Sequence, residues 1–319
     1  MTPRDTYAEA FKRFVLPSHW RPGAWRNAIV VASGLTAMAA EAVLRTARSA
    51  QVTVHRDPDT CLSDAQMSPD RPVLGCTYSG RATEVWDAVS RLVAIRHPVA
   101  VLTGARDTRA FDPASAAAGK SRGSGVASEM SVPSVTLPNL QGLACLHHLI
   151  VCAALPRVIG SSPEVPVVGC DVFATIVFLE MAHQQDRIPV FVACGHGFRS
   201  RVLLSYWLEL LRRPAILLRF PDWTHDFLWA AHRSDDPGFA FVLEQPRMDL
   251  SDHRAVKTIA CLAGRGYPVH VLPPCDAEES ESAVSYLLSA ADAFYALAVR
   301  NGCDLAVELR LDEGAENGI

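Results

Sequence analysis

The stretch that decides the fold is residues 72–103, PVLGCTYSGRATEVWDAVSRLVAIRHPVAVLT. An apolar run at 72–76 predicts a buried strand, and the Thr, Ser and Gly residues after it predict a tight turn. Residues 83–95 have apolar positions at helical spacing, and a second apolar run at 98–103 predicts another strand. A strand, a helix and a strand in this order indicate a parallel pair joined by a crossover helix.

The same order of elements occurs before this stretch. Residues 27–33 form an apolar run that ends at Gly34, helix-forming residues follow at 35–49, and residues 52–55 have a strand-like composition. An amphipathic helix is expected at the N-terminus. Strands that alternate with helices at this spacing favour a parallel sheet covered by helices on both faces, which is a three-layer αβα domain.

The second half of the chain repeats this pattern. An apolar run at 187–194 leads through Gly195-His196-Gly197 into a helical pattern at 199–211. Between the halves we expect a loop at 107–134, a helix at 140–155 and a connector that begins at Pro156. Further strands are expected at 215–219, 239–243 and 267–272, and a helix at 281–300. We therefore predict an α/β protein of two similar domains with parallel sheets, residues 1–155 with the N-terminal helix and residues 156–319 with the C-terminal helix.

Composition narrows the class of protein. Hydrophobic residues make up 49% and charged residues 20% of the 319 residues, which is typical of a globular chain. The net charge of −4 gives no general attraction for nucleic acid or anionic lipid. The nine cysteines contain no CxxC pair, so neither a disulfide framework nor a zinc site is indicated. With no signal-like start and no long apolar span, we expect a cytoplasmic protein that binds a small molecule.

Two turns have residues suited to holding an anion. In the turn after the 72–76 strand, Thr77, Ser79 and Thr83 offer hydroxyl groups beside the N–H groups of a helix start. Gly34 and Thr36 occupy the corresponding turn after the first strand. The alternative for both turns is ordinary helix capping with a glycine that permits a tight bend.

Glu209 and His225 form the candidate catalytic pair. A carboxylate can remove a proton alpha to a carbonyl, and an imidazole can move protons during opening of a sugar ring. The apolar neighbours of Glu209 in Tyr206-Trp-Leu-Glu-Leu-Leu211 predict a raised pKa and a stronger base. The alternative is a solvated helix glutamate and a histidine in a surface loop.

Two other motifs are interpreted as structural. His147 and His148 are adjacent on a predicted helix and point in different directions, so we expect them to pack in a core or an interface, with no metal site. Gly119-Lys-Ser-Arg-Gly lacks the first glycine of a nucleotide-binding loop, where Ala114 stands, and no Gly-x-Gly-x-x-Gly follows the first strand. No cofactor is therefore expected.

Taken together, these motifs resemble those of the bifunctional phosphoglucose/phosphomannose isomerase family, within the SIS (sugar isomerase) superfamily of double-domain proteins. Thr77-Tyr-Ser-Gly80 resembles the family's Ser-Tyr-Ser-Gly phosphate loop, and Ser33-Gly-Leu-Thr36 lies where its Gly-Gly-Ser turn would fall. Phe220-Pro-Asp-Trp-Thr-His225 resembles its Phe-Pro-Glu-Leu-Asn-His segment. Glu209 precedes His225 by 225 − 209 = 16 residues, as the family's catalytic base precedes its histidine.

The resemblance implies a role for each of these residues. Thr36, Thr77 and Ser79 would hold the phosphate of the substrate, and Glu209 would shuttle a proton between C1 and C2. His225 would assist ring opening from the partner subunit of a homodimer, so that the sites are shared between subunits. The expected reaction is aldose–ketose isomerisation of a phosphorylated or other anionic sugar through an enediol.

The chain departs from the family pattern at three places. Ala82 stands where the phosphate loop has threonine, and Leu137-Pro-Asn139 stands where the family has Pro-Arg. The family's lysine near the C-terminus is replaced by Arg310 as the nearest cationic residue. These departures favour a divergent member that acts in a specialised pathway. The alternative is a non-catalytic sugar-phosphate-binding or regulatory module.

Overall fold

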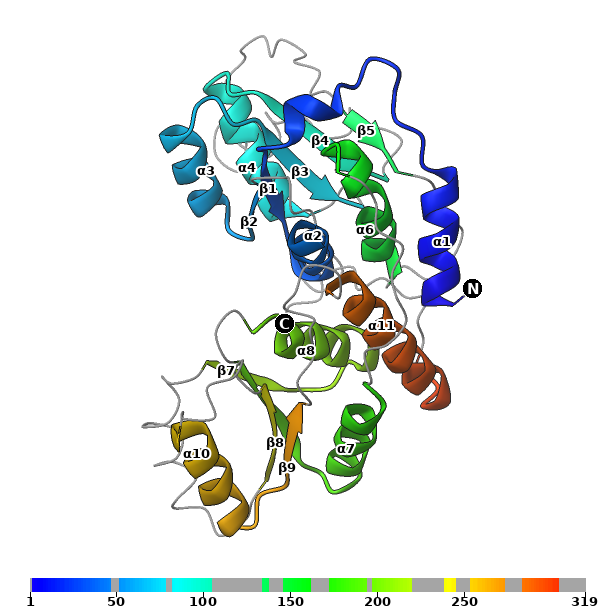
Figure 1. The fold of residues 1–319 in the computed structure, drawn as a ribbon, viewed down its shortest axis with the longest axis vertical. Coiled ribbons are helices and arrows are strands. Elements are labelled where there is room, and N and C mark those ends of the chain that lie inside the picture. Colours follow the sequence, from blue (N-terminus) through cyan, green and yellow to red (C-terminus); the bar gives the residue numbers. More distant parts are fainter. Residues whose placement is uncertain are drawn as a thin grey trace, which may run out of the picture. The chain divides into compact units, whose positions relative to one another are not determined.

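The computed structural model describes residues 2–46, 52–78, 82–104, 134–137, 146–161, 172–193, 197–219, 238–244, 253–272 and 283–303. The chain divides into two compact units, whose elements are labelled in Figure 1. Unit 1 comprises Met1–Pro166 and Glu279–Val284, and unit 2 comprises Val167–Glu278 and Ser285–Ile319. The division between residues 155 and 156 stays a prediction.

Unit 1 is built on a five-stranded parallel sheet with the order β2-β1-β3-β4-β5. Every residue of β1, β3 and β4 is buried, as expected for apolar strands that are covered on both faces. The strands are β1 (Ile29–Ala32), β2 (Thr53–His55), β3 (Val73–Thr77), β4 (Val99–Thr103) and β5 (Ser134–Thr136).

The helices of unit 1 lie on the two faces of this sheet (Figure 1). They are α1 (Pro3–Arg13), α2 (Gly34–Thr46), α3 (Pro58–Met67), α4 (Thr83–Ala94) and α6 (His147–Val158). Helix α1 begins in a capping box of Thr2 and Asp5, and the carboxylate of Asp57 caps α3 through the N–H of Thr60 at 2.8 Å. Helix α6 packs against α1 and α2, whereas α3 packs against α4.

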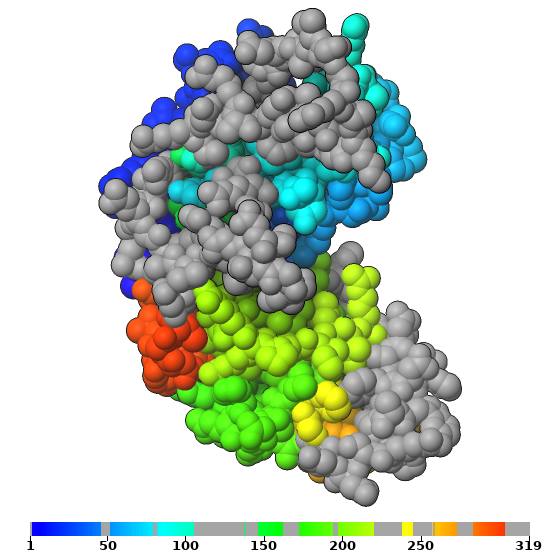
Figure 2. Space-filling model, turned by 180° about the vertical axis from the view of Figure 1, so that it is seen from behind, coloured from blue at the N-terminus to red at the C-terminus, as the bar shows by residue number. Residues whose placement is uncertain are grey.

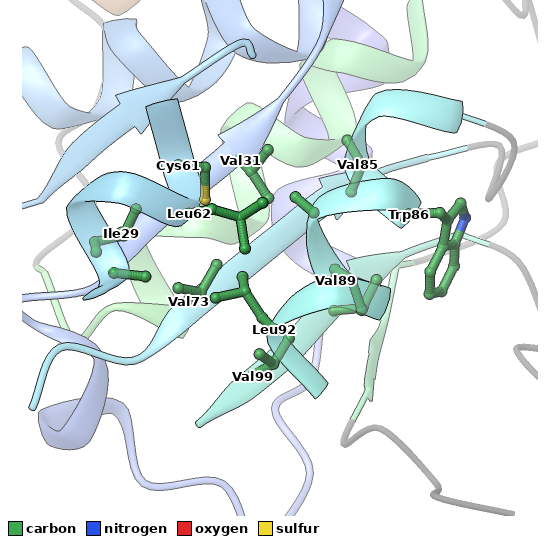
Figure 3. Close-up of a cluster of buried hydrophobic side chains, with 13 residues drawn as sticks. Ile29, Val31, Cys61, Leu62, Val73, Val85, Trp86, Val89, Leu92 and Val99 are labelled. Atoms are coloured by element: carbon green, nitrogen blue, oxygen red, sulfur yellow. The ribbon is translucent and has the colours of Figure 1, made fainter. Parts of the chain in front are cut away.

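The core between the sheet and helices α3 and α4 is shown in Figure 3. Side chains alternate along a strand, so Ile29 and Val31 of β1 point to the same face. Each fully buried aliphatic side chain contributes about 1.5–3 kcal/mol relative to an exposed one. The buried members of the cluster are Ile29, Val31, Cys61, Leu62, Ala65, Val73, Val85, Trp86, Ala88, Val89, Leu92, Val99 and Val101.

Helix α6 corrects one prediction. The sequence pattern ends this helix at residue 155 because Pro156 interrupts it, but the helix continues through the buried Pro156 to Val158. Contacts with the N-terminal segment hold this last turn in place. Arg157 donates a hydrogen bond from Nη1 to the carbonyl of Phe14 at 2.8 Å, and the indole N–H of Trp20 donates to the carbonyl of Val158 at 3.0 Å.

Unit 2 contains a four-stranded parallel sheet with the order β7-β6-β8-β9. Its core on one face joins the sheet to Leu262 of α10, and α7 and α8 contact the sheet elsewhere. Helix α11 contacts α8, where the phenol of Tyr206 stacks against the ring of Phe294. The elements are α7 (Phe173–Gln184), β6 (Ile188–Ala193), α8 (Phe198–Leu211), β7 (Ile216–Arg219), β8 (Phe239–Glu244), α10 (His253–Gly264), β9 (Val269–Leu272) and α11 (Ala283–Arg300).

These units confirm the predicted fold class of α/β domains with parallel sheets. The sequence analysis did not predict α3, α7 or α10, and most of the predicted loop at 107–134 lies outside the described residues. Among the helices that the structure describes, none is both long and apolar enough to cross a membrane.

Candidate functional site

The strand order of unit 1 identifies one place where a ligand is expected. From β1 the chain moves outward to β2, and from β3 it moves in the opposite direction to β4, so β1 and β3 flank a topological switch point. In open α/β sheets, ligands bind at the carboxyl ends of the strands beside such a point. Gly34 and Thr36 follow β1, and Thr77 ends β3. The fold therefore brings these three predicted residues to one edge of the sheet.

The ends of β3 and β4 are tied together at this edge. Thr77 pairs with Thr103 in the parallel ladder, and their exposed fractions are 3% and 0%. Just beyond this pair, the N–H of Gly104 donates a hydrogen bond to the carbonyl of Tyr78 at 2.9 Å. Thr103 is a second hydroxyl at the edge, which the sequence motifs did not single out.

The start of α2 meets the geometric requirement of an anion site. Gly34 is exposed and has φ = 52°, a left-handed conformation that glycine adopts without strain. The first helical bond then runs from the N–H of Ala37 to the carbonyl of Ser33 at 3.1 Å. The N–H groups at the very start of the helix are available to a ligand or to water, and Thr36 lies half-buried in this first turn.

The start of α4 has no side-chain cap. Ala82 is the N-cap residue, its backbone is extended, and its methyl group cannot accept a hydrogen bond from the first turn. Thr83 follows as the first helical residue and is exposed. Helix α4 follows β3 directly, so its N-terminal dipole end lies at the same sheet edge as Thr77.

One residue that the sequence interpretation assigned to packing belongs to this edge. The imidazole of His147, the first residue of α6, stacks on the ring of Tyr78 with centroids 3.8 Å apart and an interplanar angle of 29°. The Tyr78 ring also covers Gly104, where an added Cβ would lie 2.8 Å from a ring carbon. His148, by contrast, is buried as expected. No sequence signal pairs Tyr78 with His147, because only the tertiary fold brings them together.

The cysteine at this edge has no reactive role. Cys76 precedes Thr77 in β3 and is completely buried, and burial raises the pKa of its thiol to about 12. A thiol with that pKa remains protonated at neutral pH and is a poor nucleophile and metal ligand. Among the residues that the structure describes, no group of three His, Cys, Asp or Glu side chains has the arrangement of a metal site.

Glu209 lies in unit 2, in the last turn of α8. Its neighbours Tyr206, Trp207 and Leu210 are buried, but the helical period turns Leu208 and Glu209 outward, and both are exposed. The surface of α8 and β7 is seen as the yellow-green region in Figure 2. The prediction that apolar side chains surround the Glu209 carboxylate is therefore wrong for the single chain.

Three predicted site residues lie outside the described residues: Ser79, His225 and Arg310. The other predicted site residues are described, those of the anion site at the unit 1 edge and Glu209 on α8 of unit 2. The edge offers hydroxyl groups, backbone N–H groups at helix starts and one imidazole. These groups suit an oxyanion such as a phosphate ester.

Comparison with known proteins supports the fold. No protein-family model and no curated protein sequence matches the chain. Similar solved structures include a candidate phosphosugar isomerase from Clostridium difficile 630, with 11% identity, a TM-score of 0.55 and coverage of 100% of this chain and 98% of that one. A candidate sugar-binding protein from Salmonella typhimurium LT2 has 14% identity, a TM-score of 0.51 and coverage of 92% and 98%.

A third similar structure is the C-terminal domain of glucosamine-fructose-6-phosphate aminotransferase from Francisella tularensis. It has 10% identity, a TM-score of 0.51 and coverage of 96% of both chains. At these identities the likeness concerns the fold. The chain therefore has the SIS-type fold of two α/β units, each with a parallel sheet between helices.

Proposed function

We propose that this protein is an aldose–ketose isomerase that converts a phosphorylated sugar through an enediol intermediate. The observation that carries the proposal is the convergence of Gly34, Thr36 and Thr77 at the switch point of the unit 1 sheet. The SIS-type fold supports a sugar phosphate as the ligand, because the similar structures include a candidate phosphosugar isomerase. The motif resemblance to phosphoglucose/phosphomannose isomerases supports the type of reaction.

In the proposed mechanism, the phosphate of the sugar is held at the unit 1 edge. Thr36 and Thr77 donate hydroxyl hydrogen bonds, and the N–H groups at the starts of α2 and α4 face the phosphate oxygens. Ser79 and Thr83 add further hydroxyl donors. Such contacts bind substrate and transition state alike, so they anchor the sugar while the chemistry occurs at C1 and C2.

The proton transfer is assigned to Glu209. Its carboxylate removes the proton from C2 of the open-chain aldose, the C–H electrons form the C1–C2 double bond, and the C1 carbonyl oxygen gains a proton. Return of a proton to C1, together with loss of the C2 hydroxyl proton, gives the ketose. His225 moves the proton during ring opening, and Arg310 is the proposed cationic stand-in for the family's lysine near the C-terminus.

We further propose that the protein acts as a homodimer in the cytoplasm. Leu208 and Glu209 are both exposed in the single chain, so a partner subunit that covers them and supplies His225 would give the carboxylate a drier environment. Cys61, Cys76 and Cys152 are buried free thiols, which accords with a reducing compartment. Sedimentation measurements across a range of concentrations test the dimer.

The proposed base is tested with Glu209→Gln, which keeps the shape of the side chain but removes its basicity. We expect turnover of the substrate to fall by about 1,000-fold or more while sugar-phosphate binding is retained. Glu180→Gln is the matched control, because Glu180 lies on α7 in a surface ion pair with Arg300 at 2.7 Å. If Glu209→Gln and Glu180→Gln turn over equally fast, Glu209 is not the base.

The competing function is a sugar-phosphate-binding or regulatory module without catalysis. It is favoured by the exposure of Glu209 and by the alanine at the start of α4. One similar structure is a candidate sugar-binding protein. This function predicts that sugar phosphates bind at the unit 1 edge and are recovered unchanged.

A further inference from the structure

Unit 2 contains a sheet edge that corresponds to the proposed phosphate site of unit 1. Its strand order β7-β6-β8-β9 places β6 and β8 at the switch point, as β1 and β3 are placed in unit 1. Helix α8 follows β6 as α2 follows β1. Each helix start has a glycine in the left-handed region, with φ = 52° at Gly34 and φ = 58° at Gly197. The two sheets therefore present equivalent helix starts at equivalent edges.

The two sheet edges differ in the residue that ends the neighbouring strand. Thr77 ends β3, one residue past the Ala32–Cys76 pair, and its side chain is neutral. Glu244 ends β8, one residue past the Val192–Leu243 pair, and brings a carboxylate to the same kind of position. This difference decides what each edge can bind.

The Glu244 carboxylate lies on the first turn of α8. Its Oε2 accepts a hydrogen bond from the N–H of Ser200 at 3.3 Å, and its Oε1 accepts one from Nε of Arg199 at 3.4 Å. The side chains of Arg199 and Glu244 are only 5% and 1% exposed. The hydroxyl of Ser200 also donates to the carbonyl of Val192 at 3.4 Å, so this turn contacts both β6 and β8.

We propose that Glu244 is a built-in anion that occupies the oxyanion position of unit 2, so that an external phosphate binds only at unit 1. The assignment of unit 1 rests on the proposed function, whereas the occupation of unit 2 rests on the Arg199–Glu244 pair. The Glu244 carboxylate already pairs with the Arg199 guanidinium and accepts the N–H of Ser200, so a second anion would have to displace it from both groups. Glu244 thus makes the two similar sheet edges unequal.

The proposal predicts what happens when the carboxylate is removed. In Glu244→Ala, the buried Arg199 guanidinium loses its ion pair with Glu244, and the N–H of Ser200 loses the Glu244 oxygen as an acceptor. Breaking a buried ion pair in this way is strongly destabilising. The space left by the side chain suits a small oxyanion, so formate, acetate or inorganic phosphate should restore the missing charge.

The first experiment measures the Tm of the full chain in formate, acetate or phosphate against chloride at equal ionic strength. We expect Glu244→Ala to lower the Tm by roughly 10 °C in chloride. Formate should recover half of that loss or more, while the wild-type Tm stays unchanged. Glu180→Ala is the matched control, because it breaks a surface Glu–Arg pair and should show little loss and no recovery by anions.

The second experiment counts phosphate sites by calorimetry. We expect one site per chain in the wild type and two in Glu244→Ala, and the second site should disappear in Arg199→Met/Glu244→Ala. If the Tm of Glu244→Ala does not respond to any of the three anions, or if it fails to fold in all of them, the proposal is wrong. Equal numbers of sites in the wild type and in Glu244→Ala would also contradict it.

A failure of the Glu244 proposal can be distinguished from a failure of the proposed function. Thr77→Val should weaken the wild-type phosphate site and leave the recovery of Glu244→Ala by formate intact. If the wild type binds no phosphate at all, the assignment of unit 1 fails, but the anion dependence of Glu244→Ala still tests the role of Glu244.

Discussion

At the scale of single residues, Thr77 and Tyr78 are held at the unit 1 edge by different parts of the fold. Thr77 is placed by the end of a buried strand, and its exposed fraction of 3% leaves it little freedom. Tyr78 is placed by contacts with Gly104 on one neighbouring strand end and with His147 on α6. Both residues are therefore held by packing, which is what the proposed phosphate site requires.

Thr77→Val tests the anchoring role at nearly constant side-chain volume. A hydrogen bond to a charged group contributes about 1.5–3 kcal/mol, so the Kd for a sugar phosphate should rise by roughly 10-fold or more. Calorimetry with the phosphorylated sugar and with the free sugar separates the contribution of the phosphate group to binding from the contribution of the sugar. Equal weakening for both ligands would mean that Thr77 does not contact the phosphate.

Gly104→Ala tests the packing of Tyr78. The added methyl group would lie 2.8 Å from a ring carbon and 2.9 Å from the carbonyl oxygen of Tyr78, so the turn must shift. We expect a loss of about 1–3 kcal/mol in the free energy of unfolding, together with weaker sugar-phosphate binding. Gly23→Ala is the control, since a Cβ there meets nothing within 4 Å. If Gly104→Ala binds the sugar phosphate as tightly as the wild type does, Tyr78 is not part of the site.

At the scale of elements, α7 and β9 are joined by a histidine with a perturbed pKa. Burial lowers the pKa of His270, which lies on β9, stacks against Phe178 at 5.3 Å and contacts the hydroxyl of Thr175 at 3.0 Å. The folded state therefore favours the neutral imidazole. Protonation weakens this contact between the strand and the helix.

The resulting pH dependence has a defined sign. The pKa of His270 is lower in the folded chain than its unfolded value of 6.5. The neutral imidazole therefore makes its full contribution to the stability of the fold above pH 6.5. That contribution is lost as the pH falls from 6.5 through the folded pKa. Urea unfolding between pH 7.5 and pH 5 should show a steeper loss of stability for the wild type than for His270→Gln. Parallel curves for the two proteins would contradict this role.

Sequence patterns predicted helices and strands well where a single physical requirement, such as burial on both faces, determines the residues of the element. β1 and β3 were predicted to within two residues because strands covered on both faces need continuous apolar runs. Helix α3 was not predicted, because Asp57-Pro58-Asp59 is equally typical of a turn and only Cys61, Leu62 and Ala65 are buried. Helix α6 passes through Pro156 because tertiary contacts outweigh the local preference.

The candidate site was predictable to the extent that it depends on strand ends. Gly34, Thr36 and Thr77 were singled out because they lie in turns between a strand and a helix, and the strand order places these turns at one edge; their role as anion ligands stays a prediction. His147 and the Arg199–Glu244 pair were not, because their contacts join positions far apart in the chain. The surroundings of Glu209 were predicted wrongly, since its neighbours Tyr206, Trp207 and Leu210 are buried on another face of the helix.

At the scale of the whole molecule, two units whose first four strands follow the same order have different edges. Unit 1 ends its central strand with a buried threonine, and unit 2 ends its own with a buried glutamate paired to arginine. In our proposals, this difference leaves the unit 1 edge open to an external phosphate, whereas the corresponding position in unit 2 already holds the Glu244 carboxylate.

The most direct test of that reaction follows the proton that the enediol mechanism moves. The wild-type protein is incubated with a panel of aldose and ketose phosphates in D2O, and the sugar is examined by proton NMR. We predict that one of these sugars loses its C2 proton signal, gains deuterium and gives the matching ketose. A sugar phosphate that binds at the unit 1 edge and shows neither exchange nor interconversion, with no exchange in the rest of the panel, would contradict the isomerase function.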